Sequence, residues 1–162
     1  MEIHFEYLRE YESLLQSTPL QRDYQEFLRF FKYLRADLEQ AFPSCAFLGG
    51  AVENGMDYSY FQFTDDALRT HGLKIVIAYV HKACSLEIWL SGVNRKTQAD
   101  VFSRLQKTGT DYEQTPDPNR FDYILKAKLL PEGGFSGGDA LFGEIRANVR
   151  RFLEDVTLLC AG

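Results

Sequence analysis

Apolar positions recur every three or four residues over the first quarter of the chain. A first predicted helix, which includes the segment REYESLLQ, carries on one side Tyr7, Leu8, Tyr11, Leu14 and Leu15. Thr18, Pro19 and Gln21 then give the signature of a helix start: a capping residue, a proline at the first helical position and a capping box. The second predicted helix has apolar residues at the same spacings, namely Tyr24, Phe27, Leu28, Phe31, Leu34, Leu38 and Phe42. Pro43 ends it, because proline disfavours the helical conformation of the residue before it.

After Pro43, the spacing of the apolar residues changes to a period of two. Asn54-Gly55 stands between two β-rich runs and is a strong short-range signal of a hairpin. A two-residue turn there pairs Glu53 with Met56, Ala51 with Tyr58 and Gly49 with Tyr60. One face of this predicted hairpin carries Leu48, Val52, Phe61 and Phe63, and the other carries Phe47, Gly49, Ala51, Tyr58, Tyr60 and Gln62.

A short helix, with Thr64 as its cap and Gly72 as its terminator, leads into a second predicted hairpin, LKIVIAYVHKACSLEIWLSG. Any even-numbered loop around Lys82 to Cys84 gives the same alternation of side chains between the two faces. The face that we expect in the core carries Ile75, Ile77, Tyr79, Leu86, Ile88 and Leu90. The opposite face carries Val76, Ala78, Val80, Glu87, Trp89 and Ser91.

The rest of the chain predicts two more helices and one more strand. A third long helix begins at Asn94 and ends before Gly109, with Gln98, Val101, Phe102 and Leu105 inward. The segment TGTDYEQTPDPNR indicates a loop, and FDYILKAKLL a fifth strand with Lys126 and Lys128 outward on a solvent-facing edge. After the glycine-rich connector PEGGFSGGD, the last helix has an apolar stripe of Phe142, Ile145, Val149, Phe152, Val156 and Leu159.

This order of elements predicts an α+β fold. We expect an antiparallel sheet of four to five strands built from two hairpins, with two N-terminal helices, a central helix and a long C-terminal amphipathic helix. Residues 1–162 are expected to form a single α+β domain. The predicted core includes Phe61, Phe63, Ile77, Leu86, Ile88, Phe152 and Val156.

Charge and cysteine content narrow the classes of function. The net charge of −5 argues against non-specific nucleic-acid binding, which needs clustered lysine and arginine. The first residues do not resemble a secretory signal, and no apolar run approaches the ~20 residues that span a bilayer, so we expect no membrane partner. Cys45, Cys84 and Cys160 follow no C-x-x-C spacing and indicate reduced thiols in a cytoplasmic protein.

Three segments resemble a known family: MDYSYFQFT, LKIVIAYVHKACSLEIWLSGVNRKTQ and the amphipathic C-terminal helix. The chain is similar over most of its length to a family of small, mostly bacterial α+β proteins that is described only as a domain of unknown function. The resemblance implies a single bacterial cytosolic domain and no particular activity. The common pattern that it implies contains Tyr60, His81, Glu87, Trp89, Asn94 and Arg95.

The segment LEIWLSGVNRKTQ holds the only tryptophan, Trp89, which is flanked by Glu87 and Arg95. Asn94 stands where a helix cap is expected. Arg95 would lie in the first helical turn, where a cation opposes the helix dipole, so we expect it to have an acidic partner. Glu87 is the nearest candidate, and a structural Glu87–Arg95 pair is one interpretation. The other is that Arg95 anchors an anionic ligand.

If both hairpins have the predicted registers, Tyr58, Tyr60 and Trp89 share one face of the sheet. Together with Glu87 and Arg95, these aromatic side chains could bind a small planar or charged ligand. The alternative is that this face packs under the N-terminal helices or a second subunit, and the sequence is compatible with a homodimer. We therefore expect a non-catalytic domain that binds a small ligand or a protein partner.

The second functional hypothesis is a small enzyme that acts on a compact anionic metabolite. Arg95 would then be the anchor, and His81 or Glu87 the acid–base group. Such a site needs His81, Glu87 and Arg95 to converge on one cavity, whereas strand alternation places His81 opposite Glu87. A His81–Cys84 dyad and a metal site are disfavoured because no ligand motif is present, and no cofactor is expected. Asp57 and Glu87 lack the lysine typical of metal-dependent nucleases, and GGFSGG lacks the Gly-Lys-Ser/Thr of a phosphate loop.

Overall fold

A computed structural model describes residues 1–130 and 133–161. The chain divides into two compact units, residues 1–36 and residues 37–162. The expectation of a single domain over residues 1–162 stays a prediction, and the two units are described separately.

The first unit is helical, as its apolar spacing predicts. Helix α1 spans Phe5–Ser17, and none of its side chains is buried. Helix α2 spans Leu20–Ala41 and continues into the second unit. Thr18 stands at the junction: its backbone N–H donates to the Leu14 carbonyl at 3.0 Å, which ends α1, while its hydroxyl oxygen accepts from the Leu20 N–H at 3.4 Å. Two N-terminal helices are therefore confirmed, with Pro43 just beyond the second.

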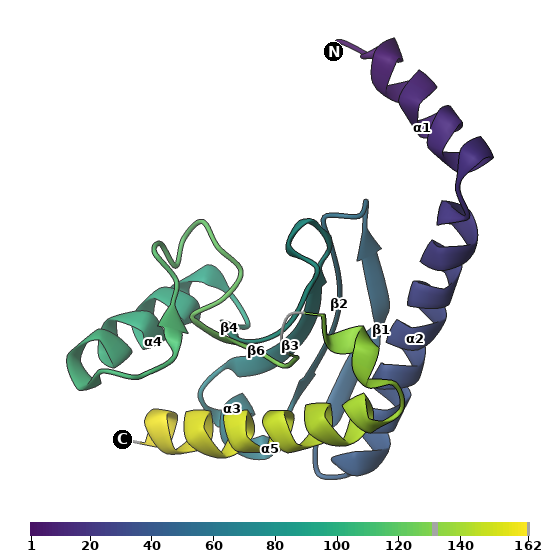
Figure 1. The fold of residues 1–162 in the computed structure, drawn as a ribbon. Helices are drawn as coiled ribbons and strands as arrows, with labels where there is room; N and C mark the ends of the chain where they lie inside the picture. The colour runs from purple at the N-terminus through teal and green to yellow at the C-terminus, as the bar shows by residue number, and fades with distance from the viewer. Residues whose placement is uncertain (131–132, 162) are drawn as a thin grey trace. The chain divides into compact units, whose positions relative to one another are not determined.

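The second unit is built on one antiparallel sheet (Figure 1). Its strands are β1 (Ala46–Asn54), β2 (Tyr58–Thr64), β3 (Leu73–Val80), β4 (Ser85–Gly92), β5 (Glu113–Gln114) and β6 (Leu125–Lys128). They lie in the order β1-β2-β3-β4-β6-β5. The helices are α3 (Asp66–Thr70), α4 (Arg95–Thr108) and α5 (Ala140–Ala161), with short 3₁₀ turns at His81–Ala83 and Gly134–Gly137. The α+β prediction is confirmed, although the sheet has one strand more than the upper expected number, because β5 has only two residues and lies in a segment that was expected to be a loop.

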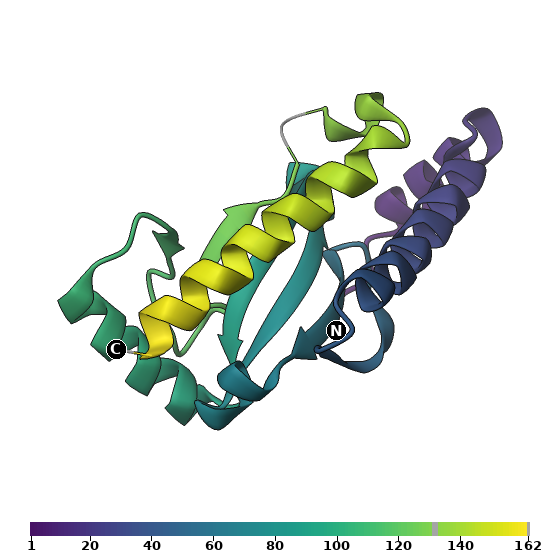
Figure 2. The same cartoon turned by 90° about the horizontal axis from the view of Figure 1, so that it is seen from below.

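One face of the sheet packs against α5, which lies across the strands in Figure 2. The registers of β3 and β4 place Ile75 opposite Leu90, Ile77 opposite Ile88 and Tyr79 opposite Leu86, as predicted. All the residues expected in the core are buried, and α5 adds to them Leu141, Ile145, Val149, Leu153 and Cys160. The apolar side chains that recur every 3.6 residues on α5 thus pack against those that alternate along the strands, and together they form one apolar layer.

The first hairpin has a different register from the predicted one. Asn54 pairs with Tyr58, and the Asp57 N–H donates to the Asn54 carbonyl at 2.9 Å. The central turn residues are therefore Gly55 and Met56, with φ of 54° and 62°, and not Asn54 and Gly55. Tyr58 thus pairs with Asn54 and not with Ala51, a shift of three residues. An odd shift moves every side chain of a strand to the other face.

The predicted faces of β1 are consequently wrong. Val52 pairs with Tyr60 and Leu48 with Gln62, so both leave the core face on which they were expected. Phe47 pairs with Phe63 and stacks on its ring, with 4.7 Å between ring centroids. A bulge between Leu48 and Val52 adds to the difference, and Gly49 within it has a φ of 67°.

Two smaller expectations also need correction. The cap of α3 is Asp65, whose side chain accepts from the Leu68 N–H at 2.8 Å, whereas the Thr64 hydroxyl donates to the Leu73 carbonyl. Strand β6 is not an edge, because it lies between β4 and β5. Lys126 is accordingly half-buried, and only Lys128 is exposed.

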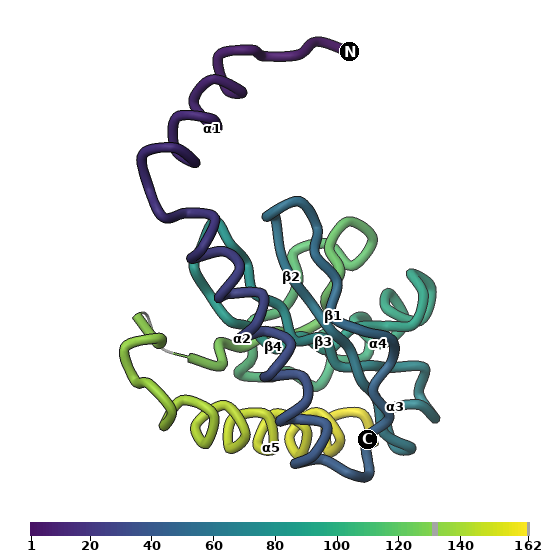
Figure 3. Tube along the Cα trace, turned by 90° about the vertical axis from the view of Figure 1, so that its right-hand side faces the viewer, coloured from purple at the N-terminus to yellow at the C-terminus, as the bar shows by residue number. Residues whose placement is uncertain are grey.

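The far end of α5 lies beside α3 (Figure 3). Within the parts of the chain that the structure describes, no helix combines the length and the apolar character needed to cross a membrane. Residues 131–132 of the expected glycine-rich connector lie outside the described residues.

Candidate functional site

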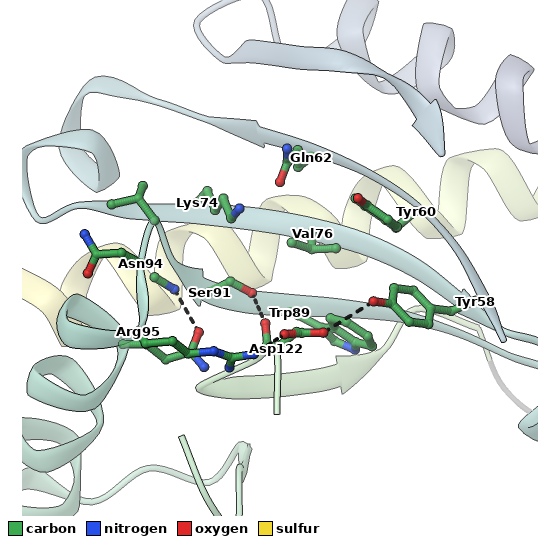
Figure 4. A pocket seen from close by; sticks show the side chains of 13 residues that line it. Tyr58, Tyr60, Gln62, Lys74, Val76, Trp89, Ser91, Asn94, Arg95 and Asp122 are labelled. Atoms are coloured by element: carbon green, nitrogen blue, oxygen red, sulfur yellow. Dashed lines mark hydrogen bonds and ion pairs between the residues drawn. The ribbon is translucent and has the colours of Figure 1, made fainter. Parts of the chain in front are cut away.

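A pocket of about 350 Å³ lies on the sheet face opposite α5 (Figure 4). Its walls come from β2, β3, β4, the start of α4 and the loop before β6. The lining residues are Tyr58, Tyr60, Gln62, Lys74, Val76, Trp89, Ser91, Gly92, Val93, Asn94, Arg95, Gln98 and Asp122. A volume of this size suits a compact ligand.

Strand alternation produces the floor of the pocket. Val76 is paired with both Gln62 and Trp89, so these side chains form one row across three strands. Lys74 and Ser91 are paired in the next row towards α4. Because side chains two residues apart on a strand are about 7 Å apart, the two rows define the length of the floor.

Aromatic side chains form one end of the pocket. The Tyr58 ring lies 5.6 Å from the Tyr60 ring and 5.7 Å from the Trp89 ring, between centroids. The Tyr123 ring also lies 5.7 Å from the Trp89 ring, between centroids. The structure thus brings together the three aromatic residues that the sequence analysis singled out. Burial, and next the nearby charge of Asp122, raises the pKa of Tyr58, so its hydroxyl stays protonated.

The loop before β6 forms a side wall and is held by the first turn of α4. Asn94 caps α4 as predicted, accepting from the Thr97 N–H at 2.8 Å. Arg95 Nη2 contacts Asp122 Oδ1 at 2.6 Å, and its Nη1 donates to the carbonyls of Pro118 and Phe121. The Tyr58 hydroxyl donates to Asp122 Oδ2 at 3.3 Å. Asp122 therefore joins α4 to β2 across the pocket.

Gln98, also on α4, holds the same loop through hydrogen bonds. Its amide nitrogen donates to the carbonyls of Pro118 and Phe121 at 2.8 and 2.7 Å, and its oxygen accepts from the Gly92 N–H at 3.2 Å. Because Gln98 is buried, these hydrogen bonds satisfy an amide that would otherwise cost stability. The position of the loop is thus fixed by side chains of α4.

Residues 5–160 match the family model "Domain of unknown function (DUF7000)". The chain belongs to this family. The predicted resemblance to an uncharacterised family is therefore confirmed, and membership brings no assigned activity with it. No curated protein and no solved structure matches the chain.

The expected Glu87–Arg95 pair is wrong. Arg95 pairs with Asp122, and the Glu87 carboxylate accepts instead from the Trp89 indole N–H at 2.7 Å. Lys126 Nζ lies 3.8 Å from Glu87 Oε2 and 3.5 Å from Glu113 Oε1. Glu87 is only 7% exposed and is not one of the pocket's lining residues. It acts on the pocket through Trp89, whose indole it orients.

His81 also lies outside the pocket. Its Nε2 is 2.8 Å from the hydroxyl of Ser59, which in turn donates to Glu53. Burial, partly offset by the charge of Glu53, lowers the pKa of His81. The Cys84 thiol contacts the His81 carbonyl and not its ring, at 3.5 Å. The three residues that an enzyme was expected to need, His81, Glu87 and Arg95, do not converge on this cavity.

No group of three or more His, Cys, Asp and Glu side chains in the described residues is arranged to hold a metal ion.

Four residues that line the pocket were not among the candidate site residues of the sequence analysis, namely Lys74, Gln62, Gln98 and Asp122. Strand alternation could have found Lys74, since it has the same parity as Val76. A lysine at the start of a strand is, however, usually solvent-exposed. Helical spacing placed Gln98 on the inward side of its helix, but nothing local marked its partners or Asp122, because these lie in a loop more than 20 positions from Gln98 and Arg95 in the sequence.

Proposed function

We propose that the chain is a non-catalytic binding domain that takes a compact, ring-containing molecule into the pocket on the sheet face opposite α5. The carrying observation is the set of Tyr58, Tyr60 and Trp89, whose rings contact one another at one end of a pocket of about 350 Å³. Aromatic faces of this kind bind flat apolar groups, and the polar remainder of the lining would orient them.

The fixed position of these side chains supports the proposal. Trp89 is held by its hydrogen bond to Glu87, and Tyr58 by its contact with Asp122. A ligand would therefore meet side chains that are already in place, which lowers the entropy cost of binding. The positions of Glu87 and His81 outside the lining favour binding over acid–base catalysis.

A pocket-filling substitution tests the proposal. Gln62 is half-buried on the floor of the pocket, and phenylalanine is well tolerated in strands. We expect a panel of compact ring compounds, neutral and charged, to raise the melting temperature of the wild type and to change Trp89 emission. Gln62→Phe should abolish both responses. Ser103→Phe, on the exposed side of α4, should retain them.

The proposal fails if no compound of the panel binds the wild type, or if Gln62→Phe binds as tightly as the wild type does. Circular dichroism of each variant checks that loss of binding is not loss of fold.

We propose also that the protein works in the cytoplasm. Cys45, Cys84 and Cys160 are all free thiols, and reduced cysteines favour a reducing compartment. Fractionation of cells that express the chain is expected to recover it with cytoplasmic markers, and recovery with an oxidising compartment would contradict the idea.

A further inference from the structure

Resting on the proposed function, we infer that the ligand is a planar ring bearing a carboxylate or phosphate group, and that the Lys74 ammonium binds this anion. The ring lies against Tyr58, Tyr60 and Trp89 at one end of the pocket. The acidic group lies towards the row that Lys74 and Ser91 form at the other end.

Lys74 is the pocket cation that the fold does not use. Its side chain lines the pocket, and it makes no hydrogen bond or ion pair with any described residue. Arg95 differs, because its guanidinium already contacts Asp122 and two backbone carbonyls. An anion bound at Arg95 would have to displace those contacts, whereas an anion at Lys74 displaces only water.

The charges of the lining lead to the same ligand. The ionisable lining residues that carry charge at neutral pH are Lys74, Arg95 and Asp122, two cations and one anion, which leaves one positive charge. Asp122 is paired with Arg95 at 2.6 Å, so the uncompensated charge belongs to Lys74. A positive pocket in a chain of net charge −5 selects an anion against the overall field of the protein.

The length of the floor sets the size of the ligand. Val76 and Trp89 occupy one row, and Lys74 and Ser91 the next, about 7 Å away along the strands. A single ring with an acidic substituent bridges this distance and lets the flexible lysine reach the acid. Lysine binds carboxylate and phosphate as a point charge, so both groups satisfy the same geometry.

Calorimetric titration with benzoate, phenyl phosphate and the neutral isostere benzamide tests the inference. We expect the wild type to bind at least one of the two acids about tenfold or more tightly than benzamide. Lys74→Met, which keeps the length of the side chain without its charge, should weaken binding of the acid about tenfold and leave benzamide unchanged. Lys74→Arg should restore most of the affinity. Lys107→Met, in the last turn of α4, is the matched control and should bind as the wild type does.

The outcomes separate the two proposals. If the acids and benzamide bind equally well, or Lys74→Met binds the acids with unchanged affinity, the inference is wrong while the binding pocket stands. If Arg95→Met loses acid binding and Lys74→Met does not, the anion lies at Arg95, which also contradicts it. If none of these probes nor any compound of the wider panel binds the wild type, the proposed function fails and the inference with it. Preference between benzoate and phenyl phosphate identifies the acidic group.

Discussion

Lys126 and Lys128 stand two residues apart on β6 and were expected to be equivalent, yet their surroundings differ. Lys126 is half-buried between the carboxylates of Glu87 and Glu113, and its ammonium lies 5.0 Å from the centre of the Tyr123 ring. Lys128 is exposed. A lysine that compensates a buried carboxylate is costly to remove, because the carboxylate then remains without its cation.

We therefore expect Lys126→Met to lower the free energy of unfolding by about 1–3 kcal/mol, because Glu87 would stay buried without its cation. Lys128→Met should change it by less than about 0.5 kcal/mol. Urea denaturation of both variants measures the difference. If both variants lost a similar free energy of unfolding, the ion pair of Lys126 with Glu87 would contribute nothing beyond what an exposed lysine does.

The pH dependence of this difference follows from the pKa of Lys126. Burial lowers that pKa, but the charges of Glu87, Tyr123 and Glu113 outweigh burial and raise it above the ordinary value of 10.5. A cation whose pKa is raised by folding stabilises the protein fully below its ordinary pKa, and this contribution is lost as the pH rises through the raised value. The wild-type advantage over Lys126→Met should thus be complete at neutral pH and shrink above 10.5.

At the scale of elements, the junction of β4 and α4 depends on Gly92. A Cβ at this position would lie 2.7 Å from the backbone nitrogen of Gln98 and 2.9 Å from its Cα, too close for either to accommodate. Gly92→Ala should force α4 away from β4 and destabilise the fold by about 1–3 kcal/mol. Gly50→Ala in β1, where a Cβ meets nothing within 4 Å, is the control and should be near neutral. Thermal unfolding of both variants is the measurement, and equal melting temperatures would contradict the close contact.

A second junction joins the segment after α4 to α5. The Tyr112 hydroxyl donates to Asp155 on α5 at 2.5 Å, and the Tyr112 ring meets Phe152 edge-on at 5.0 Å between centroids. Tyr112→Phe should lower the free energy of unfolding by about 0.5–1.5 kcal/mol at pH values near neutral. Tyr11→Phe, on an exposed position of α1, should not.

The same contact has a pH signature. Burial, and next the hydrogen bond to Asp155, raises the pKa of Tyr112 from 10.0 to about 12. The neutral phenol is thus the form that the fold favours, so its contribution is complete below pH 10 and is lost as the pH rises to about 12. The stability difference between the wild type and Tyr112→Phe should narrow over that range, and a constant difference would contradict the assignment.

At the scale of the whole molecule, the cysteine thiols report on different depths of the second unit. Cys84 is exposed, Cys45 is half-buried, and Cys160 is buried on α5. Burial raises the pKa of both Cys45 and Cys160, which lowers their thiolate fraction further. A chromogenic aryl disulfide should therefore modify Cys84 first and Cys160 last, with Cys84→Ser lacking the fast phase. Denaturant should make all three equivalent, and a fast reaction of Cys160 in the native protein would show that α5 opens readily.

The sequence by itself determined the elements whose pattern does not depend on distant neighbours. The alternation of β3 and β4 was correct for any even-numbered loop, so Ile77, Ile88 and Trp89 were assigned to the right faces. The apolar stripe of α5 and the cap at Asn94 are likewise properties of a few consecutive residues. The apolar face of the sheet and the aromatic end of the pocket followed from these periods.

Tertiary structure decided the register of β1 and the partners of the charged side chains. Three residues, Gly55 to Asp57, separate the paired Asn54 and Tyr58 where a two-residue turn was expected, so the register shifted by an odd number of residues and Val52 changed face. Glu87 was assigned to Arg95 because the two are close in sequence, but folding brings Lys126 to Glu87 and Asp122 to Arg95. Local periodicity is set by backbone geometry and is readable from a short segment. Which charges meet depends on how strands and loops far apart in the chain are packed together, and only the folded chain contains that information.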